Sequence, residues 1–102
     1  MTRSEYNGWT NYETWLVKLW LDNDEHDYWV DQAHYVQGDV AKLANLLKQE
    51  HDDALPDGLS GFALDLVRAG LGEVNWDEIA QSLIKSADEV YDTQYAKAEG
   101  DA

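Results

Sequence analysis

The most regular stretch of this chain is residues 75–91, which read NWDEIAQSLIKSADEVY. Apolar residues recur there at intervals of three and four, the spacing that places side chains on one face of an α-helix. This face comprises Trp76, Ile79, Ala80, Leu83, Ala87, Val90 and Tyr91. Asn75, with Glu78 three residues later, is a pairing typical of a helix start. Since no other stretch alternates with period two over the length of a strand, the sequence predicts an all-α fold.

Residues 10–21 are predicted to form the most deeply buried helix. Thr10 and Glu13 read as a capping box, in which the hydroxyl accepts a backbone N–H and the carboxylate reaches back. Residues 15–21 are apolar except for Lys18. A helix that is apolar almost all round is normally a buried helix, so we expect this one at the centre of the core.

Two further helices are predicted over residues 24–37 and from residue 40 onward. The apolar stripe of the first consists of Trp29, Ala33 and Val36. Gly38 suits the position that ends a helix, and Asp39 suits the N-cap of the next. The apolar residues of that next helix, at i, i+3, i+4 and i+7, are Val40, Leu43, Ala44 and Leu47.

A fourth helix is predicted over residues 59–71, after a turn at residues 53–58 that contains the single proline, Pro56. Its core-facing stripe is predicted to be Leu59, Phe62, Ala63 and Leu66. Residues 1–102 then form a single acidic helical domain. We expect a compact bundle of four to five helices, with an ordered core over about residues 7–94.

The net charge is the strongest functional signal in the sequence. The chain has 21 Asp and Glu against 7 Lys and Arg, a formal charge of −14 over 102 residues. About 2 to 8 charges suffice to keep a small domain in solution, and a larger excess opposes compactness through self-repulsion. Direct binding to DNA, RNA or an anionic membrane is disfavoured, because no basic surplus can release counterions. A basic protein partner is favoured by the same logic.

Catalysis and cofactor binding are not indicated. The chain has no cysteine, no motif for a serine nucleophile and no phosphate-binding loop. His26, His34 and His51 lack the i, i+4 spacing of a metal-binding pair, so no catalytic residue, metal ligand or cofactor is assigned. No apolar run approaches the about 18 residues of a membrane span, and no signal-peptide core is seen. We expect a non-enzymatic protein of the cytoplasm of the cell that makes it.

Aromatic residues crowd the first third of the chain: Trp9, Tyr12, Trp15, Trp20 and Trp29. Such residues can form a stacking platform for bases or pack in the core, with each indole N–H bonded to a backbone carbonyl. A base platform needs cationic surroundings, and residues 19–41 contain no Lys or Arg. Core packing is therefore favoured, with Tyr6 and Trp9 as the expected exposed aromatics.

The acidic residues are grouped along the chain. No positive charge lies between Lys18 and Lys42. Within this stretch Asp24, Asp27 and Asp31 recur at i, i+3 and i+7, which predicts three carboxylates on one helix face, with neighbours about 5–6 Å apart. Duplex DNA offers one charge per about 3.4 Å of axis on each strand, so such a row approximates a phosphate strand. A solvated helix face and an adaptation to high salt are the alternatives.

Two motifs resemble those of a known group of proteins. Residues 11–15 read N-Y-E-T-W and are followed by L-W-L-D-N at residues 19–23, while residues 74–80 read V-N-W-D-E-I-A. Over most of residues 7–84 the chain resembles small uncharacterised proteins of bacteriophages and other mobile elements. The resemblance implies no activity, and both motifs read as helix starts with a buried tryptophan. Small, strongly acidic phage proteins often resemble, in their charge, inhibitors of host defence systems.

The sequence therefore favours a non-enzymatic inhibitor that occupies the basic nucleic-acid channel of a host defence protein, such as a CRISPR effector or a restriction enzyme. The residues predicted to bind this partner are Asp22, Asp24, Glu25, Asp27, Asp31, Glu50, Asp52, Asp53 and Asp57. The alternative is a small scaffold protein that forms a homodimer or binds another phage protein. Exposed Tyr6, Trp9 or Tyr35 would then form an apolar patch.

Overall fold

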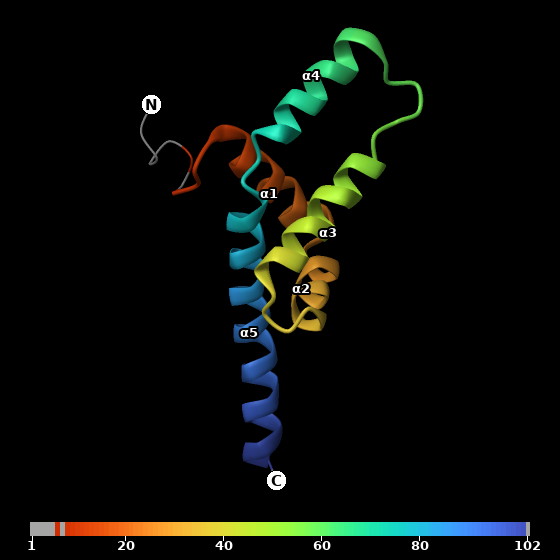
Figure 1. The fold of residues 1–102 in the computed structure, drawn as a ribbon. Coiled ribbons are helices and arrows are strands. Elements are labelled where there is room, and N and C mark those ends of the chain that lie inside the picture. Colours follow the sequence, from red (N-terminus) through yellow and green to blue (C-terminus); the bar gives the residue numbers. More distant parts are fainter. Residues whose placement is uncertain (1–5, 7, 102) are drawn as a thin grey trace.

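The computed structural model describes residue 6 and residues 8–101, with side chains described up to residue 91. Its helices are α1 (Tyr12–Asp24), α2 (His26–Tyr35), α3 (Val40–Asp53), α4 (Gly61–Gly72) and α5 (Trp76–Asp101) (Figure 1). The described residues contain no strand. The predicted all-α fold of four to five helices is confirmed.

Helix α5 is the axis on which the bundle is assembled. Helices α2 and α3 make their most extensive contacts with α5, which runs past them toward the C-terminus (Figure 1). The core lies where these three helices meet, on the fully buried side chains of Trp29, Leu43, Leu47, Ile79 and Leu83. The predicted apolar face of α5 is confirmed from Trp76 to Ala87, whereas Val90 is 42% exposed.

Helix α1 is not at the centre of the core, contrary to the prediction from its apolar run. The buried residues of α1 are Thr14, Lys18 and Leu21, a narrow stripe at i, i+4 and i+7. Leu19 is 41% exposed and Trp20 is 60% exposed. The physical reason is that α2, α3 and α5 fill the core among themselves, so that α1 covers it with one edge only.

The polar residue that interrupts the apolar run of α1 is itself buried. Lys18 lies on the buried stripe, and its Nζ is 2.5 Å from Asp22 Oδ1 one turn later. Its alkyl stem is therefore packed against the bundle while its charge is paired at the edge, as long cationic side chains commonly are.

The starts of α1 and α5 are hydrogen-bonded to each other. Asn11 is the N-cap of α1, and its Oδ1 accepts from the N–H of Thr14 at 2.9 Å and from the Thr14 hydroxyl at 2.6 Å. The N–H of Asn75 in turn donates to Thr14 Oγ1 at 2.9 Å. Thr10 donates from its N–H and its hydroxyl to the Glu78 carboxylate, at 3.0 and 2.6 Å. We call these five residues the α1–α5 junction.

This junction replaces the capping box that was predicted from Thr10 and Glu13. Because the Glu78 carboxylate binds Thr10, the neighbouring Asn11 caps α1 instead. The predicted helix start at Asn75 is confirmed, since Asn75 Oδ1 accepts from the N–H of Glu78 at 3.1 Å. The junction therefore joins the two sequence motifs, residues 11–15 and 74–80, in one hydrogen-bonded unit.

Helices α2 and α3 follow the prediction closely. Helix α2 begins two residues later than predicted, because α1 extends to Asp24 and Glu25 alone separates the two helices. After α2, Gln37 and Gly38 adopt left-handed backbone, with φ of 55° and 82°, and this reverses the chain. Asp39 caps α3 as predicted, accepting from the N–H of Lys42 at 3.0 Å.

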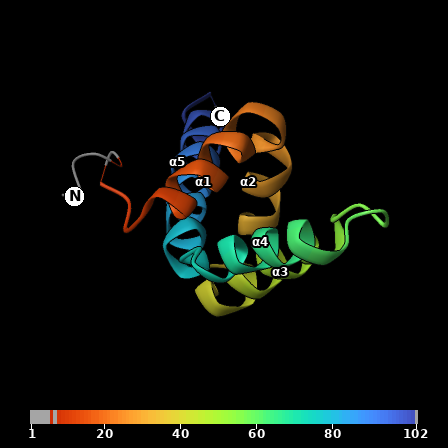
Figure 2. The same cartoon turned by 90° about the horizontal axis from the view of Figure 1, so that it is seen from above.

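Helix α4 differs most from the prediction. It contributes no buried side chain, and on its predicted core stripe Phe62 is 82% exposed and Leu66 is 60% exposed. Gly61, with φ of 60°, begins the helix in a backbone conformation that favours glycine. Helix α4 projects at one end of the molecule and lies over α3 when seen from above (Figures 1 and 2). It stays exposed because α2, α3 and α5 close the core without it.

Candidate acidic interaction surface

The end of α1 and the start of α2 form an acidic corner. Helix α1 ends at Asp24 and α2 begins at His26, so the chain turns at Glu25 alone. The residues around this turn line a hollow of about 440 Å³, and they are Asp22, Asn23, Asp24, Glu25, His26, Asp27 and Tyr28. We call these seven residues the acidic corner. It brings together four of the carboxylates that were predicted to bind a partner.

Glu50 extends the negative charge of the acidic corner onto α3. The Tyr28 hydroxyl donates to Glu50 Oε1 at 2.9 Å, which holds this carboxylate beside α2. The hydrogen bond to Glu50 raises the pKa of the Tyr28 phenol above its usual 10.0, with further contributions from desolvation and from the charges of Glu50 and Glu25. A negative potential has this effect because phenolate would add a like charge.

Glu25, at the turn itself, is held by the core. Trp29 Nε1 donates to Glu25 Oε2 at 2.9 Å, and Trp29 is 1% exposed. The indole N–H thus finds its acceptor in a carboxylate instead of the backbone carbonyl that was expected. A buried ring therefore positions one of the carboxylates of the acidic corner.

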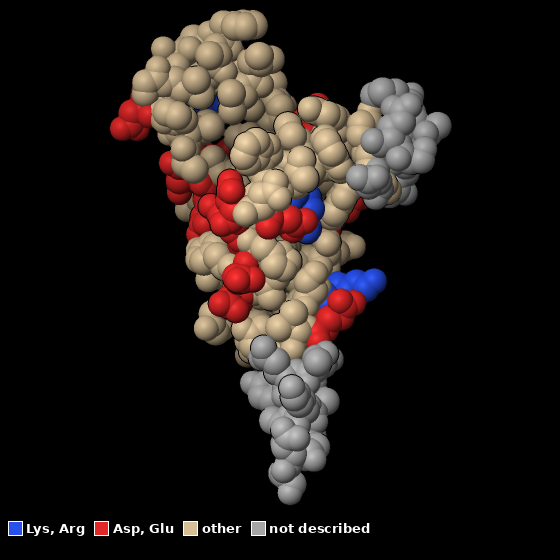
Figure 3. Space-filling model, turned by 180° about the vertical axis from the view of Figure 1, so that it is seen from behind, with Lys and Arg blue, Asp and Glu red and all other residues tan. Residues whose placement is uncertain are grey.

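Little of the negative charge at the acidic corner is neutralised. Among the side chains that the structure describes, Lys18 forms an ion pair with Asp22 at 2.5 Å, and His26 Nδ1 lies 3.4 Å from the same Asp22 oxygen. Both engage the same carboxylate, so Asp24, Glu25 and Asp27 have no cationic partner within this set. Figure 3 shows acidic side chains gathered in a band across one face of the molecule, with few basic side chains among them.

Asp31 lies one turn beyond the acidic corner and faces α5. Its Oδ1 accepts from the Tyr91 hydroxyl at 2.8 Å, and the Tyr91 ring stacks on His34 with 3.7 Å between ring centroids. The predicted row of Asp24, Asp27 and Asp31 on one helix is wrong for its first member. Because the chain turns at Glu25, Asp24 belongs to α1 while the other two belong to α2.

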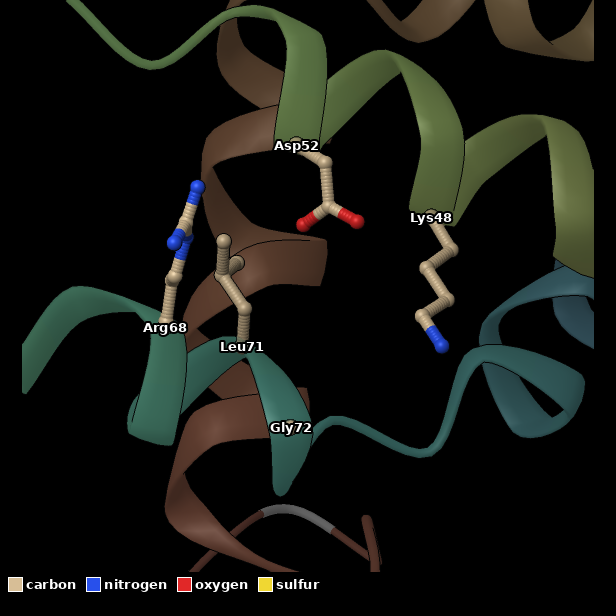
Figure 4. A pocket seen from close by; sticks show the side chains of 5 residues that line it. All are labelled: Lys48, Asp52, Arg68, Leu71 and Gly72. Atoms are coloured by element: carbon tan, nitrogen blue, oxygen red, sulfur yellow. The ribbon is translucent and has the colours of Figure 1, made fainter. Parts of the chain in front are cut away.

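The second predicted acidic stretch, residues 50–57, is split by the structure. Only Glu50 approaches the acidic corner, through Tyr28. Asp52 enters a different hollow of about 420 Å³ between α3 and α4, lined by Lys48, Asp52, Arg68, Leu71 and Gly72 (Figure 4). There Asp52 lies between the two cationic side chains. Asp53 ends α3, and Asp57 lies exposed in the loop that leads to α4.

The prediction for the aromatic residues is correct only in part. Trp29 is buried, and Trp9 is half-buried against the core. Trp20 is 60% exposed and Tyr12 is 49% exposed, because α1 buries only a narrow stripe. Tyr6 and Trp9 are half-buried instead of exposed, since Trp9 packs against the core and the Tyr6 ring lies edge-on to Tyr12, at 6.5 Å between centroids.

The remaining histidine, His51, is part of the packing. Its Nδ1 lies 2.7 Å from the carbonyl oxygen of Leu47, and its ring lies between those of Trp29 and Trp76, at 6.4 and 5.2 Å between centroids. Within the described residues, no group of three or more His, Cys, Asp or Glu is arranged to hold a metal ion. Nor does any described helix have the length and apolar character that crossing a membrane requires.

The fold defines the class of this protein: a small acidic helical protein in which the starts of the first and last helices bond to each other. The chain belongs to a family of unknown function (DUF7249), whose model matches residues 2–97. The motifs at residues 11–15 and 74–80 lie in this range and form the α1–α5 junction, so they serve the fold. Comparison with curated proteins and with solved structures gave no match.

Proposed function

We propose that this protein is a non-enzymatic binding protein that places its acidic corner on the basic nucleic-acid-binding surface of another protein. The observation that carries the proposal is the hollow edged by the carboxylates of residues 22, 24, 25 and 27, of which only Asp22 has a cationic partner among the described side chains. A Lys or Arg side chain that enters this hollow would meet several acceptors at once, as it does on a phosphate backbone.

The hydrogen bonds behind the acidic corner support a binding role over that of a merely solvated face. Glu25 is fixed by the buried Trp29, and Glu50 is fixed by Tyr28. Carboxylates that are already held lose less side-chain entropy when a partner binds. Unpaired like charges destabilise the free protein through their mutual repulsion. A partner that neutralises them removes this repulsion, and this favours binding.

In its finer form, the proposal is that a phage or another mobile element encodes this protein to inhibit a host defence system. The motifs at residues 11–15 and 74–80, which resemble those of small phage proteins, support this source. The target class is a CRISPR effector or a restriction enzyme, whose nucleic-acid channel the acidic corner would occlude. Long-range attraction between opposite charges would speed association and would weaken steeply with salt.

The experiment is capture of purified CRISPR effectors and restriction enzymes on the immobilised protein, each tested free and pre-loaded with its nucleic acid. We expect capture of at least one free enzyme and loss of capture after pre-loading, because both ligands need the same basic surface. The triple variant Asp24→Asn, Glu25→Gln and Asp27→Asn should lower the affinity about 100-fold, at about 1 kcal/mol for each lost charge contact.

The matched control removes three negative charges elsewhere, with Glu73→Gln, Asp88→Asn and Glu89→Gln, all on exposed residues. It changes the net charge equally, and we expect less than about a threefold loss of affinity because distant exposed charges are screened. Equal losses in the two variants would reduce the effect to net charge and remove the acidic corner as the site. Capture of none of these enzymes would reject the target class.

The alternative function, association through exposed aromatics, is not favoured at the residues that suggested it. Tyr6 and Trp9 are half-buried, and only Tyr35 is widely exposed, at 70%. Other exposed apolar side chains lie on α1, such as Trp20 at 60%, and on α4, such as Phe62 at 82%.

A further inference from the structure

Helix α1 presents an exposed tryptophan at the edge of the acidic corner. Trp20 is 60% exposed, and Asp24, one helical turn later, is exposed as well. Residues four apart on a helix are neighbours, with about 5–6 Å between their Cβ atoms. Because each Cα–Cβ bond of a helix tilts toward the N-terminus, Asp24 is tilted toward Trp20. An indole ring and a carboxylate thus lie side by side where the acidic corner begins.

Neither side chain is engaged by another described part of the chain. Among the described side chains, no aromatic ring or cation packs on the Trp20 ring, and no cation pairs with Asp24. At about 100° per residue, Trp20 and Asp24 fall together on one flank of the buried stripe of α1. Asp22, which pairs with Lys18, falls on the other flank. The ring and its neighbouring carboxylate are therefore free to bind a partner.

We propose that Trp20 and Asp24 bind an arginine side chain of the basic partner, with the guanidinium plane over the indole face and its N–H groups directed to the carboxylate. The face of an indole attracts a cation that lies within about 6 Å of the ring. Guanidinium is planar and weakly hydrated, so it stacks on a ring and still donates from its edge, whereas an ammonium is a strongly hydrated point charge. The inference rests on the proposed function, because it takes the acidic corner as the surface that binds.

The charge beside Trp20 favours an arginine over other occupants of an exposed ring. A nucleic-acid base would bring its phosphate toward Asp24 and the rest of the acidic corner, and like charges repel. A second copy of this chain would bring a further charge of −14 to the same surface. A cation gains from the ring and from the carboxylates together, so electrostatic complementarity selects it.

A second exposed aromatic residue supports the same chemistry on α2. Tyr28 lines the hollow of the acidic corner and is 46% exposed, while its hydroxyl holds Glu50. Its ring and that carboxylate repeat, across the turn at Glu25, the combination of ring and acid found at Trp20 and Asp24. The acidic corner therefore has an exposed aromatic ring on each of its two helices, which favours a partner rich in arginine.

The experiment compares hexa-arginine with hexa-lysine as ligands of the whole chain, by isothermal titration calorimetry at one low salt concentration. The two peptides have equal charge, so the ratio of their affinities measures recognition of guanidinium. We expect hexa-arginine to bind more tightly, and Trp20→Leu should lower the ratio about three- to fivefold, as loss of an exposed cation–π contact does. Trp20→Phe keeps a ring face and should retain part of the preference. Circular dichroism should stay unchanged in both variants, since Trp20 is exposed.

Two controls test the position of the site. Tyr35→Leu removes an aromatic side chain of 70% exposure at the other end of α2 and should leave the ratio unchanged. With hexa-arginine, Trp20→Leu and Asp24→Asn together should lose less than the product of the two single losses, because one guanidinium contacts both residues. Trp20→Leu with Asp27→Asn, which lies on α2, should lose close to the product.

An affinity ratio that Trp20→Leu leaves unchanged, or that Tyr35→Leu lowers equally, would overturn the proposal, as would independent losses at Trp20 and Asp24. The peptides separate this failure from failure of the proposed function. If no CRISPR effector or restriction enzyme is captured while Trp20 still confers the preference for hexa-arginine, the proposed function is rejected and the arginine site stands. If a captured enzyme needs residues 24, 25 and 27 but Trp20→Leu leaves the ratio unchanged, the arginine site is rejected and the proposed function stands.

Discussion

Helices α5 and α4 both carry apolar residues at helical spacing, yet only one of them is part of the core. On α5, Ile79 and Leu83 are completely buried, whereas on α4 Phe62 is 82% exposed. The difference lies in what holds each helix. The start of α5 is bonded to α1 through the α1–α5 junction, and α2 and α3 pack against it, burying its apolar face from Trp76 to Ala87. Periodicity thus determines that a helix forms, while its neighbours determine which face is buried.

The largest effect should come from truncating one apolar side chain on each helix. Leu83→Ala should lower the free energy of unfolding by about 2–5 kcal/mol, because it leaves a cavity between α5 and its neighbours. Leu66→Ala makes the same truncation on α4 and should change the free energy of unfolding by less than about 0.5 kcal/mol. Urea denaturation, followed by circular dichroism at low protein concentration, measures both. Similar losses for the two variants would show that α4 is packed in solution.

A smaller effect is expected from removing a polar side chain that contacts the start of α5 or lies at the start of α4. Thr14→Val keeps the shape of the buried side chain but removes the oxygen that accepts the Asn75 N–H. Leaving that donor unpaired should cost about 1–3 kcal/mol of unfolding free energy. Ser60, the N-cap of α4, makes no side-chain capping bond, so Ser60→Ala should cost well under that. If thermal unfolding shifts equally in both variants, the junction does not anchor α5 in the way described.

The smallest effect concerns the contact between α2 and α3. Glu50→Gln should bring the raised pKa of Tyr28 back toward 10.0, since the hydrogen bond to the Glu50 carboxylate is the main cause of the shift. Titration of phenolate absorbance, with Tyr28→Phe to assign the transition, measures this pKa, and Glu73→Gln serves as the control. If the Tyr28 pKa stays equally raised in Glu50→Gln, the Glu50 carboxylate does not accept the hydrogen bond from Tyr28.

The same shift has a consequence for stability. A pKa that is raised in the folded state means that folded Tyr28 holds its proton more tightly than unfolded Tyr28. Its contribution to stability is therefore complete below the unfolded pKa of about 10 and is lost as the pH rises through the folded value. Glu50→Gln should flatten this alkaline loss, which urea denaturation at a series of alkaline pH values would show.

Much of the fold could be predicted from local sequence, because its determinants are local. The apolar stripe of α5 and the Asp39 cap of α3 depend on residues within one or two turns, and both are confirmed. The run of residues 15–21 was misleading, since a helix with no polar face gives no information on which side is covered. The binding of Thr10 to Glu78, 68 residues away, could not be found from the chain around Thr10.

The candidate site could likewise be predicted where its residues are close in the chain. The prediction failed where the site depends on contacts between distant residues. Residues 22–27 lie together because they are consecutive and surround one turn. Glu50 joins them through Tyr28, 22 residues away along the chain. Asp52 does not join them, because it lies in the hollow between α3 and α4 (Figure 4). The exposure of α4 had only a weak signal in the sequence, the glycines at positions 61, 70 and 72.

The most direct test of the acidic corner is the salt dependence of binding to a captured enzyme. The affinity of the unchanged protein should fall linearly on a plot of log affinity against log salt concentration. We predict a clearly shallower slope for Asp24→Asn, Glu25→Gln and Asp27→Asn together, and a slope close to the original for Glu73→Gln, Asp88→Asn and Glu89→Gln. Identical slopes for the two triple variants would contradict the assignment of the acidic corner as the binding surface.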